Sequence, residues 1–162
     1  MKRYNIAIVG DAGVGKTALV KSLRGCDFQR RYVSTVGCEV HPHFTNTNTG
    51  DILLNIYDFG GKDKYFNNPN VDYPSLLKTM DLVVIVHSPD IPRSYRNANT
   101  YWRNIVEKPV LIVANKKDVG ISTETTSDLY LSSKNDAESV GTFEQTLASI
   151  LTGDKSIQVI GW

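Results

Sequence analysis

Short apolar runs alternate along this chain with longer segments of mixed polarity, and the alternation predicts an α/β fold. Some of the runs are continuous and rich in β-branched residues, which is typical of parallel strands covered on both faces. They occupy residues 6–9, 82–86 and 110–114. Residues 51–57 instead place apolar side chains at every second position, which favours a strand near the edge of the sheet.

Helical segments and a loop complete the predicted architecture. The helices are expected over residues 17–23, 93–106 and 135–151, and a last short strand over residues 129–131. Residues 119–128 are polar and rich in threonine, which favours a loop. The sequence contains no repeat and no interdomain linker, so residues 1–162 are predicted to form a single domain.

Composition agrees with a single domain and narrows the classes of partner. The chain has 162 residues, of which 41% are hydrophobic, enough for one substantial core. The 18 basic and 17 acidic residues nearly balance, so the net charge does not attract the protein to nucleic acid or to an anionic membrane. Cys26 and Cys38 allow one disulfide by parity, but the lack of a secretory signal favours free thiols in a soluble protein.

A phosphate-binding loop is predicted directly after the first strand. The motif G-x-x-x-x-G-K-[ST] is matched by Gly10-Asp11-Ala12-Gly13-Val14-Gly15-Lys16-Thr17. Backbone N–H groups from Asp11 to Ala18, together with the N-terminus of the following helix, favour bound phosphate. Lys16 is placed to reach the β- and γ-phosphates, and the Thr17 hydroxyl to ligate Mg²⁺. The alternative is a glycine-rich turn, and the loop alone does not specify the base.

A second motif indicates guanine. Asn115-Lys116-Lys117-Asp118 follows the strand at 110–114, and ligands bind at the carboxyl ends of parallel strands. The carboxylate of Asp118 can accept hydrogen bonds from guanine N1–H and the 2-amino group, whereas adenine would leave it unpaired. The Lys116 stem can cover the base, and Asn115 can tie this loop to the phosphate loop. Ser132-Ser133-Lys134 is either a third base contact or the first turn of a helix.

With both motifs in place, the chain resembles the Ras superfamily of small GTPases over nearly its whole length. The resemblance implies a P-loop NTPase fold, with a mostly parallel six-stranded sheet and helices on both faces. It also implies that Thr35 ligates Mg²⁺, that Tyr32 closes over the phosphates and that Phe28 packs on guanine. Asp58 would hold Mg²⁺ through water, and the Gly61 N–H would contact the γ-phosphate of GTP. Taken singly, Phe28 also suits a core, Tyr32 a surface and Asp58 a strand-end cap.

Further segments are similar to the Ran family in particular. They are Arg31-Tyr32-Val33-Ser34-Thr35-Val36-Gly37-Cys38-Glu39-Val40-His41-Pro42, then Asn46-Thr47-Asn48-Thr49-Gly50, and Asn99-Thr100-Tyr101-Trp102-Arg103. The resemblance implies transport receptors or an exchange factor as partners, and a place in the cytoplasm, the nucleus or both. The final residues hold no cysteine to prenylate, so no membrane anchor is expected. We expect a monomer.

The chain departs from the family pattern at catalytic positions. The family's D-x-x-G-Q is Asp58-Phe59-Gly60-Gly61-Lys62 here, so lysine replaces the glutamine that orients the attacking water. A protonated lysine only donates hydrogen bonds, although it can stabilise charge on the γ-phosphate. Ala12 stands where relatives have glycine, and its methyl group either crowds the γ-phosphate or is accommodated. With Lys16, Thr35 and Lys62 as the catalytic set, we predict slow hydrolysis.

Other departures concern partners. Only 13 residues separate Asp118 from Ser132, residues 67–74 carry a polar insertion, and we expect no C-terminal arm of the kind that the Ran family carries. Two functional interpretations follow: a slow GTPase, or a nucleotide-loaded binding module that mimics or titrates Ran-type signalling. An adenylate-type kinase would leave the second motif unexplained.

His41 and His43 lack a metal-ligand partner in the sequence, so no zinc site is predicted. Trp102 is expected to pack within a helix.

Overall fold

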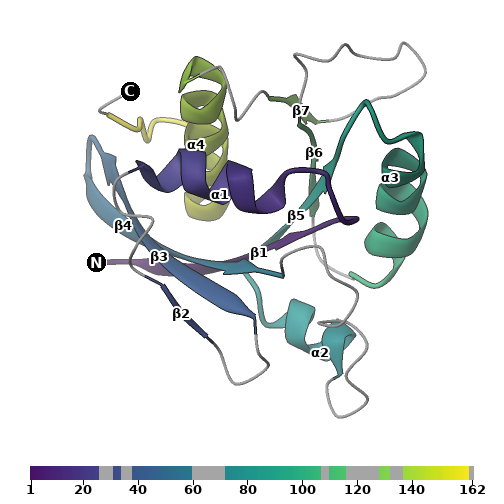
Figure 1. Cartoon of the computed structure of the whole chain (residues 1–162). Coiled ribbons are helices and arrows are strands. Elements are labelled where there is room, and N and C mark those ends of the chain that lie inside the picture. The colour runs from purple at the N-terminus through teal and green to yellow at the C-terminus, as the bar shows by residue number, and fades with distance from the viewer. Residues whose placement is uncertain are drawn as a thin grey trace.

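The computed structural model describes residues 1–25, 31–33, 38–59, 72–106, 110–115, 128–131 and 137–160. In these residues the strands form one sheet in the order β2-β3-β4-β1-β5-β6-β7 (Figure 1). The strands are β1 (Arg3–Val9), β2 (Tyr32–Val33), β3 (Glu39–Thr47), β4 (Gly50–Asp58), β5 (Leu82–His87), β6 (Val110–Ala114) and β7 (Leu129–Tyr130). The helices are α1 (Lys16–Arg24), α2 (Tyr73–Lys78), α3 (Pro92–Asn97) with the π-helical turn η3 (Ala98–Trp102), and α4 (Ala137–Thr152).

The sheet is parallel from β4 through β1, β5 and β6 to β7, and β3 is antiparallel to both of its neighbours, β2 and β4. The predicted α/β P-loop fold with a mostly parallel sheet is therefore confirmed. The two-residue strand β2, which pairs with the start of β3, adds a seventh strand to the predicted six. The alternation along β4 also matches its burial, because Ile52, Leu54 and Ile56 are buried while the residues between them are half-buried.

Two apolar layers cover the sheet, as the continuous runs required. On one face α1 and α4 pack against β1, β4 and β5, and Phe143 of α4 is fully buried there. On the other face Leu77 of α2 and Trp102 of η3 pack against alternate residues of β1, β5 and β6. Figure 1 shows α1 and α4 on one side of the sheet and α2 on the other. Burying each large apolar side chain stabilises the fold by roughly 1.5–3 kcal/mol.

The predicted helix over residues 93–106 differs from the structure in its regularity. It begins as α3, with Pro92 in its first turn, but widens into the π-helical turn η3 after Asn97. A π-helical turn inserts one residue into the hydrogen-bond spacing, and it is common at functional sites. The pattern of residues 93–106 does not predict this turn. The side chains beside it, Asn97 and Trp102, contact Asp11 of the phosphate loop, which lies far away in sequence.

Cys38 is buried and lies in no disulfide, and Cys26 lies outside the described residues, so the expectation of two thiols stays a prediction. No helix among the described segments has the length and apolar character needed to cross a membrane. After α4 the chain returns to the sheet, where Val159 bridges Thr47 and the Ile160 N–H donates to Asn46 O.

Candidate nucleotide-binding site

The two predicted motifs meet at the carboxyl ends of β1 and β6. The Asn115 side-chain amide donates to the carbonyl oxygens of Val14 at 3.2 Å and Gly15 at 3.4 Å. The Asn115 backbone N–H donates to His87 O at 2.8 Å, which fixes the residue between β5 and β6. Asn115 is fully buried. Segments about a hundred residues apart in sequence are thus joined directly at one edge of the sheet.

Close approach to β5 explains why the phosphate loop begins with glycine. Gly10 has a φ of 146°, and a Cβ atom there would lie 2.2 Å from Val86 O. No side chain fits in that space, because the obstructing atom is backbone. The loop therefore turns sharply at the end of β1 and delivers its remaining residues to the N-terminus of α1.

The Lys16 ammonium is held across the loop. Its Nζ donates to Gly10 O at 2.7 Å and to Asp11 O at 2.8 Å, and the residue is only 4% exposed. Lys16 is also the first residue of α1, where the helix N-terminus favours anions. A buried cation at a helix N-terminus, with loop N–H groups nearby, provides strong attraction for phosphate oxygens.

The predicted magnesium ligands Thr17 and Asp58 lie in contact. The Thr17 hydroxyl donates to Asp58 Oδ2 at 2.9 Å, and Asp58 is 2% exposed at the end of β4. Mg²⁺ prefers hard oxygen ligands and keeps several water molecules. A hydroxyl and a carboxylate beside a phosphate-binding loop fit that ion.

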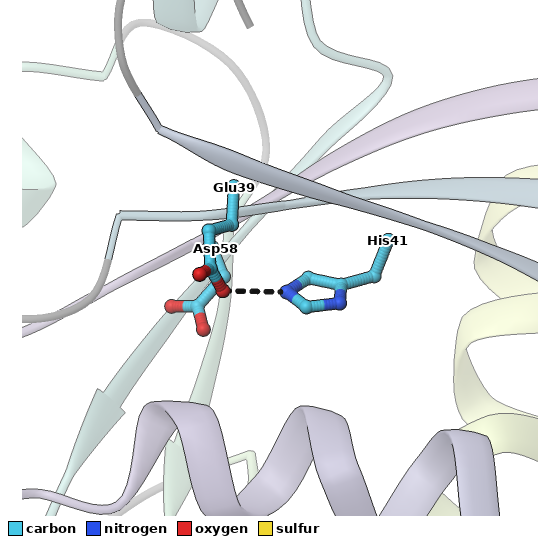
Figure 2. A group of neighbouring side chains, drawn as sticks. All are labelled: Glu39, His41 and Asp58. Atoms are coloured by element: carbon cyan, nitrogen blue, oxygen red, sulfur yellow. Dashed lines mark ion pairs between the residues drawn. The ribbon is translucent and has the colours of Figure 1, made fainter. Parts of the chain in front are cut away.

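Asp58 also belongs to a second group of side chains, whose residue types are those that bind metal ions. Potential ligand atoms of Glu39, His41 and Asp58 lie within 4.8 Å of one another, and the His41 ring points toward the Glu39 carboxylate (Figure 2). The prediction that His41 lacks a metal-ligand partner is therefore wrong, since Glu39 on the same strand and Asp58 on the neighbouring strand β4 both lie near its ring. His41 Nε2 lies 3.2 Å from Glu39 Oε2.

The tautomer of His41 argues against metal binding in this group. Arg24 Nη1 lies 3.0 Å from His41 Nδ1, and a guanidinium can only donate, so Nδ1 accepts. A neutral His41 then carries its proton on Nε2, the atom that faces Glu39. Burial lowers the pKa of His41, and the nearby Arg24 guanidinium adds to this against the opposing Asp58 and Glu39 carboxylates. The ring therefore joins Arg24 to Glu39 and is not poised as a ligand.

Two residues that the sequence did not reveal as part of the site, Asn97 and Trp102, donate hydrogen bonds to the phosphate loop. The Asp11 carboxylate accepts hydrogen bonds from the Asn97 amide and the Trp102 indole N–H. Trp102 is buried in the core layer beneath α3, as expected, but its polar edge serves Asp11. A buried tryptophan usually has a hydrogen-bond partner for its N–H, so the sequence could have indicated that Trp102 needs an acceptor, although not which one.

The described residues include some of the predicted nucleotide contacts and leave out others. Within the phosphate loop and the start of α1, Ala12, Gly13, Thr17 and Ala18 are exposed, while Val14 and Lys16 are buried. For Tyr32 only the backbone is described, as part of β2. The predicted roles of Phe28, Thr35, Gly61, Lys62, Lys116, Asp118, Ser132, Ser133 and Lys134 fall outside the described residues.

Comparison with known protein families agrees with this arrangement. The sequence model of the Ras family matches residues 5–148, which cover most of the chain. The match runs from β1 through the phosphate loop and Asn115 into α4.

Proposed function

This chain belongs to the Ras family of small GTP-binding switch proteins, and we propose that it is a Ran-like, Mg²⁺-dependent GTP/GDP switch with slow hydrolysis. The observation that carries the proposal is the direct bond from Asn115, in the base-reading motif, to the carbonyl oxygens of the phosphate loop. This bond fixes the spacing between the two ends of a guanosine phosphate.

In the proposed complex the phosphates lie against the loop and the base against the second motif. Loop N–H groups and the Lys16 ammonium bind the phosphates, with Tyr32 and Gly61 closing on the γ-phosphate side. Asp118 accepts hydrogen bonds from guanine, and the base is flanked by Phe28 and the Lys116 stem. The contacts proposed in full are Asp11, Ala12, Gly13, Val14, Gly15, Lys16, Thr17, Ala18, Phe28, Tyr32, Thr35, Gly61, Asn115, Lys116, Asp118, Ser132, Ser133 and Lys134.

Magnesium would be held by Thr17 and Thr35, with Asp58 acting through water. The ion supplies positive charge at the β- and γ-phosphates. The 2.9 Å hydrogen bond between Thr17 and Asp58 supports this assignment, since it holds the hydroxyl and the carboxylate together. Thr35 adds sensitivity to the γ-phosphate, because its contact with the ion exists only while GTP is bound.

Slow turnover follows from Lys62. Ras itself hydrolyses GTP at roughly 3–5 × 10⁻⁴ s⁻¹, and activating proteins accelerate it about 10⁵-fold. Lysine cannot accept a hydrogen bond from the attacking water, so we expect intrinsic hydrolysis below that value. Ala12 is exposed in the loop at a position where relatives have glycine, and its methyl group would either crowd the γ-phosphate or be accommodated beside it.

Lys62 also supports a second candidate function from another class. A protein that holds GTP without hydrolysing it acts as a binding module and mimics or titrates Ran-type signalling. Transport receptors or an exchange factor that contact the switch loops are the proposed partners in both cases. The proposed setting is a monomer in the cytoplasm, the nucleus or both.

One experiment separates these candidates. The purified protein is denatured, its released nucleotide is identified by chromatography, and GTP-loaded protein is then followed for phosphate release. Guanine nucleotide with slow release supports the switch, and guanine nucleotide with no release over many hours supports the binding module. Recovery of adenine nucleotide or of none, with no binding of added GDP, contradicts both.

A further inference from the structure

The Asp11 side chain connects the phosphate loop to α3 and η3. Asp11 Oδ2 accepts from Asn97 Nδ2 at 2.7 Å, and Oδ1 accepts from Trp102 Nε1 at 2.9 Å. Arg93 Nε lies 3.9 Å from Oδ2, at the outer limit of an ion pair and with its side chain 70% exposed. The Asp11 side chain itself is 13% exposed, so each carboxylate oxygen has a specific donor in a site largely shielded from water.

The π-helical turn is what lets both donors reach one carboxylate. Residues five apart differ by about 140° around an α-helix, so Asn97 and Trp102 would face different directions. In a π-helical turn each residue bonds to the one five positions on, so such residues come closer to one side of the helix than they would in an α-helix. The turn at Ala98–Trp102 therefore places the Asn97 amide and the Trp102 indole on the same side, toward Asp11.

The backbone of the same residue holds the key cation of the site. Asp11 O accepts from Lys16 Nζ at 2.8 Å, beside the bond from Nζ to Gly10 O. Fixing the Asp11 side chain fixes its peptide unit, and this determines where the Lys16 ammonium lies. The two donors also hold the Asp11 carboxylate toward α3 and η3. A carboxylate that faced the bound phosphates would instead repel them.

We propose that Asn97 and Trp102 are positioning residues for nucleotide binding, which act through Asp11 on the phosphate loop and on Lys16. The inference rests on the proposed function, because it assigns these contacts to the retention of a bound guanosine phosphate. It makes η3 part of the nucleotide site and not only a layer of the core. Loss of either donor is expected to speed the release of nucleotide about tenfold, which corresponds to about 1.4 kcal/mol.

The test is a double-mutant cycle with release of a fluorescent N-methylanthraniloyl derivative of GDP in excess Mg²⁺. Trp102→Phe keeps a ring in the core and removes only the indole N–H, and Asn97→Ala removes the second donor. Each is measured in the native background and with Asp11→Ala. Tyr101→Phe is the matched control, since Tyr101 stacks edge-on against Trp102 with ring centroids 4.9 Å apart and is half-exposed.

If the proposal is right, each variant releases the GDP derivative about tenfold faster in the native background and no more than about twofold faster with Asp11→Ala. Tyr101→Phe stays at the native rate. Equal acceleration in both backgrounds, or none in the native background, overturns the proposal, because the effect then does not pass through Asp11. Circular dichroism melting checks folding, and should Trp102→Phe fail to fold, the Asn97→Ala cycle decides.

The native protein distinguishes this inference from the proposed function. If it retains the GDP derivative and the cycle is additive, only the positioning role is wrong. If it does not bind the derivative at all, the proposed function fails and the positioning role fails with it.

Discussion

The Asn115 side chain offers the sharpest test of how the two motifs cooperate. Asn115→Ala removes the hydrogen bonds to the carbonyl oxygens of Val14 and Gly15. A neutral hydrogen bond contributes about 0.5–1.5 kcal/mol net. The distances of 3.2 and 3.4 Å lie at and just beyond the long end of the usual range, which favours the lower half of that estimate for each bond. We therefore expect a loss of about 1–2 kcal/mol, or about 5–30-fold weaker binding of GDP.

Asn115→Asp separates the hydrogen bonds from the volume of the side chain. A carboxylate has the size of the amide but only acceptors, so its oxygens would face the loop carbonyl oxygens and repel them. GDP affinity should therefore fall further than in Asn115→Ala. Isothermal titration of GDP in excess Mg²⁺ gives both affinities, and Asn104→Ala, at an exposed position in the last turn after η3, is the control.

Two results would refute this reasoning. Binding by Asn115→Ala within twofold of the native affinity would mean that the contact does not order the loop for the nucleotide. Equal GDP affinity in Asn115→Ala and Asn115→Asp would mean that repulsion between a carboxylate and the carbonyl oxygens of Val14 and Gly15 does not affect binding. Urea unfolding of the nucleotide-free variants shows whether either loss reflects a general weakening of the fold.

Three further predictions concern catalysis, packing and pH. Lys62→Gln should raise single-turnover GTP hydrolysis toward the Ras value of roughly 10⁻⁴ s⁻¹, and an unchanged rate would assign the defect elsewhere. Glu144→Ala should lower the free energy of unfolding in urea by about 1–3 kcal/mol, because it removes the acceptor 3.0 Å from buried His43 Nε2; Glu144→Gln should lose less. Burial lowers the pKa of His87, so the unfolded chain binds more protons below about pH 6.5 and stability falls as the pH drops from there toward the folded pKa. His87→Phe should flatten part of the decline between pH 7.5 and 5.5, and a profile as steep as the native one would contradict this cause.

The sheet and its layers were predictable because their signals are local. Continuous β-branched runs are typical of strands covered on both faces, and the structure buries every residue of β5. The alternation along β4 likewise indicated which side chains face α1 and α4. The meeting of Asn115 with the phosphate loop was also foreseeable, since parallel strands bring their carboxyl ends to one edge.

The contacts that escaped prediction depend on tertiary structure. Arg24 lies in the last turn of an amphipathic helix, where arginine is usually exposed, yet it is buried against His41 of β3. The π-helical turn likewise lies where Asn97 and Trp102 donate to Asp11, a residue more than eighty positions away in sequence. Periodicity along one segment does not record such distant partners.

The most direct test of the central claim compares guanosine and adenosine phosphates on the native protein and on Lys16→Ala. Titrating GDP and ADP in excess Mg²⁺ measures both affinities, and a circular dichroism melt confirms that the variant is folded. We predict a strong preference of the native protein for GDP and a large loss of GDP affinity in Lys16→Ala. Equal affinities for GDP and ADP, or a folded Lys16→Ala protein that binds GDP as tightly as the native one, would contradict the account.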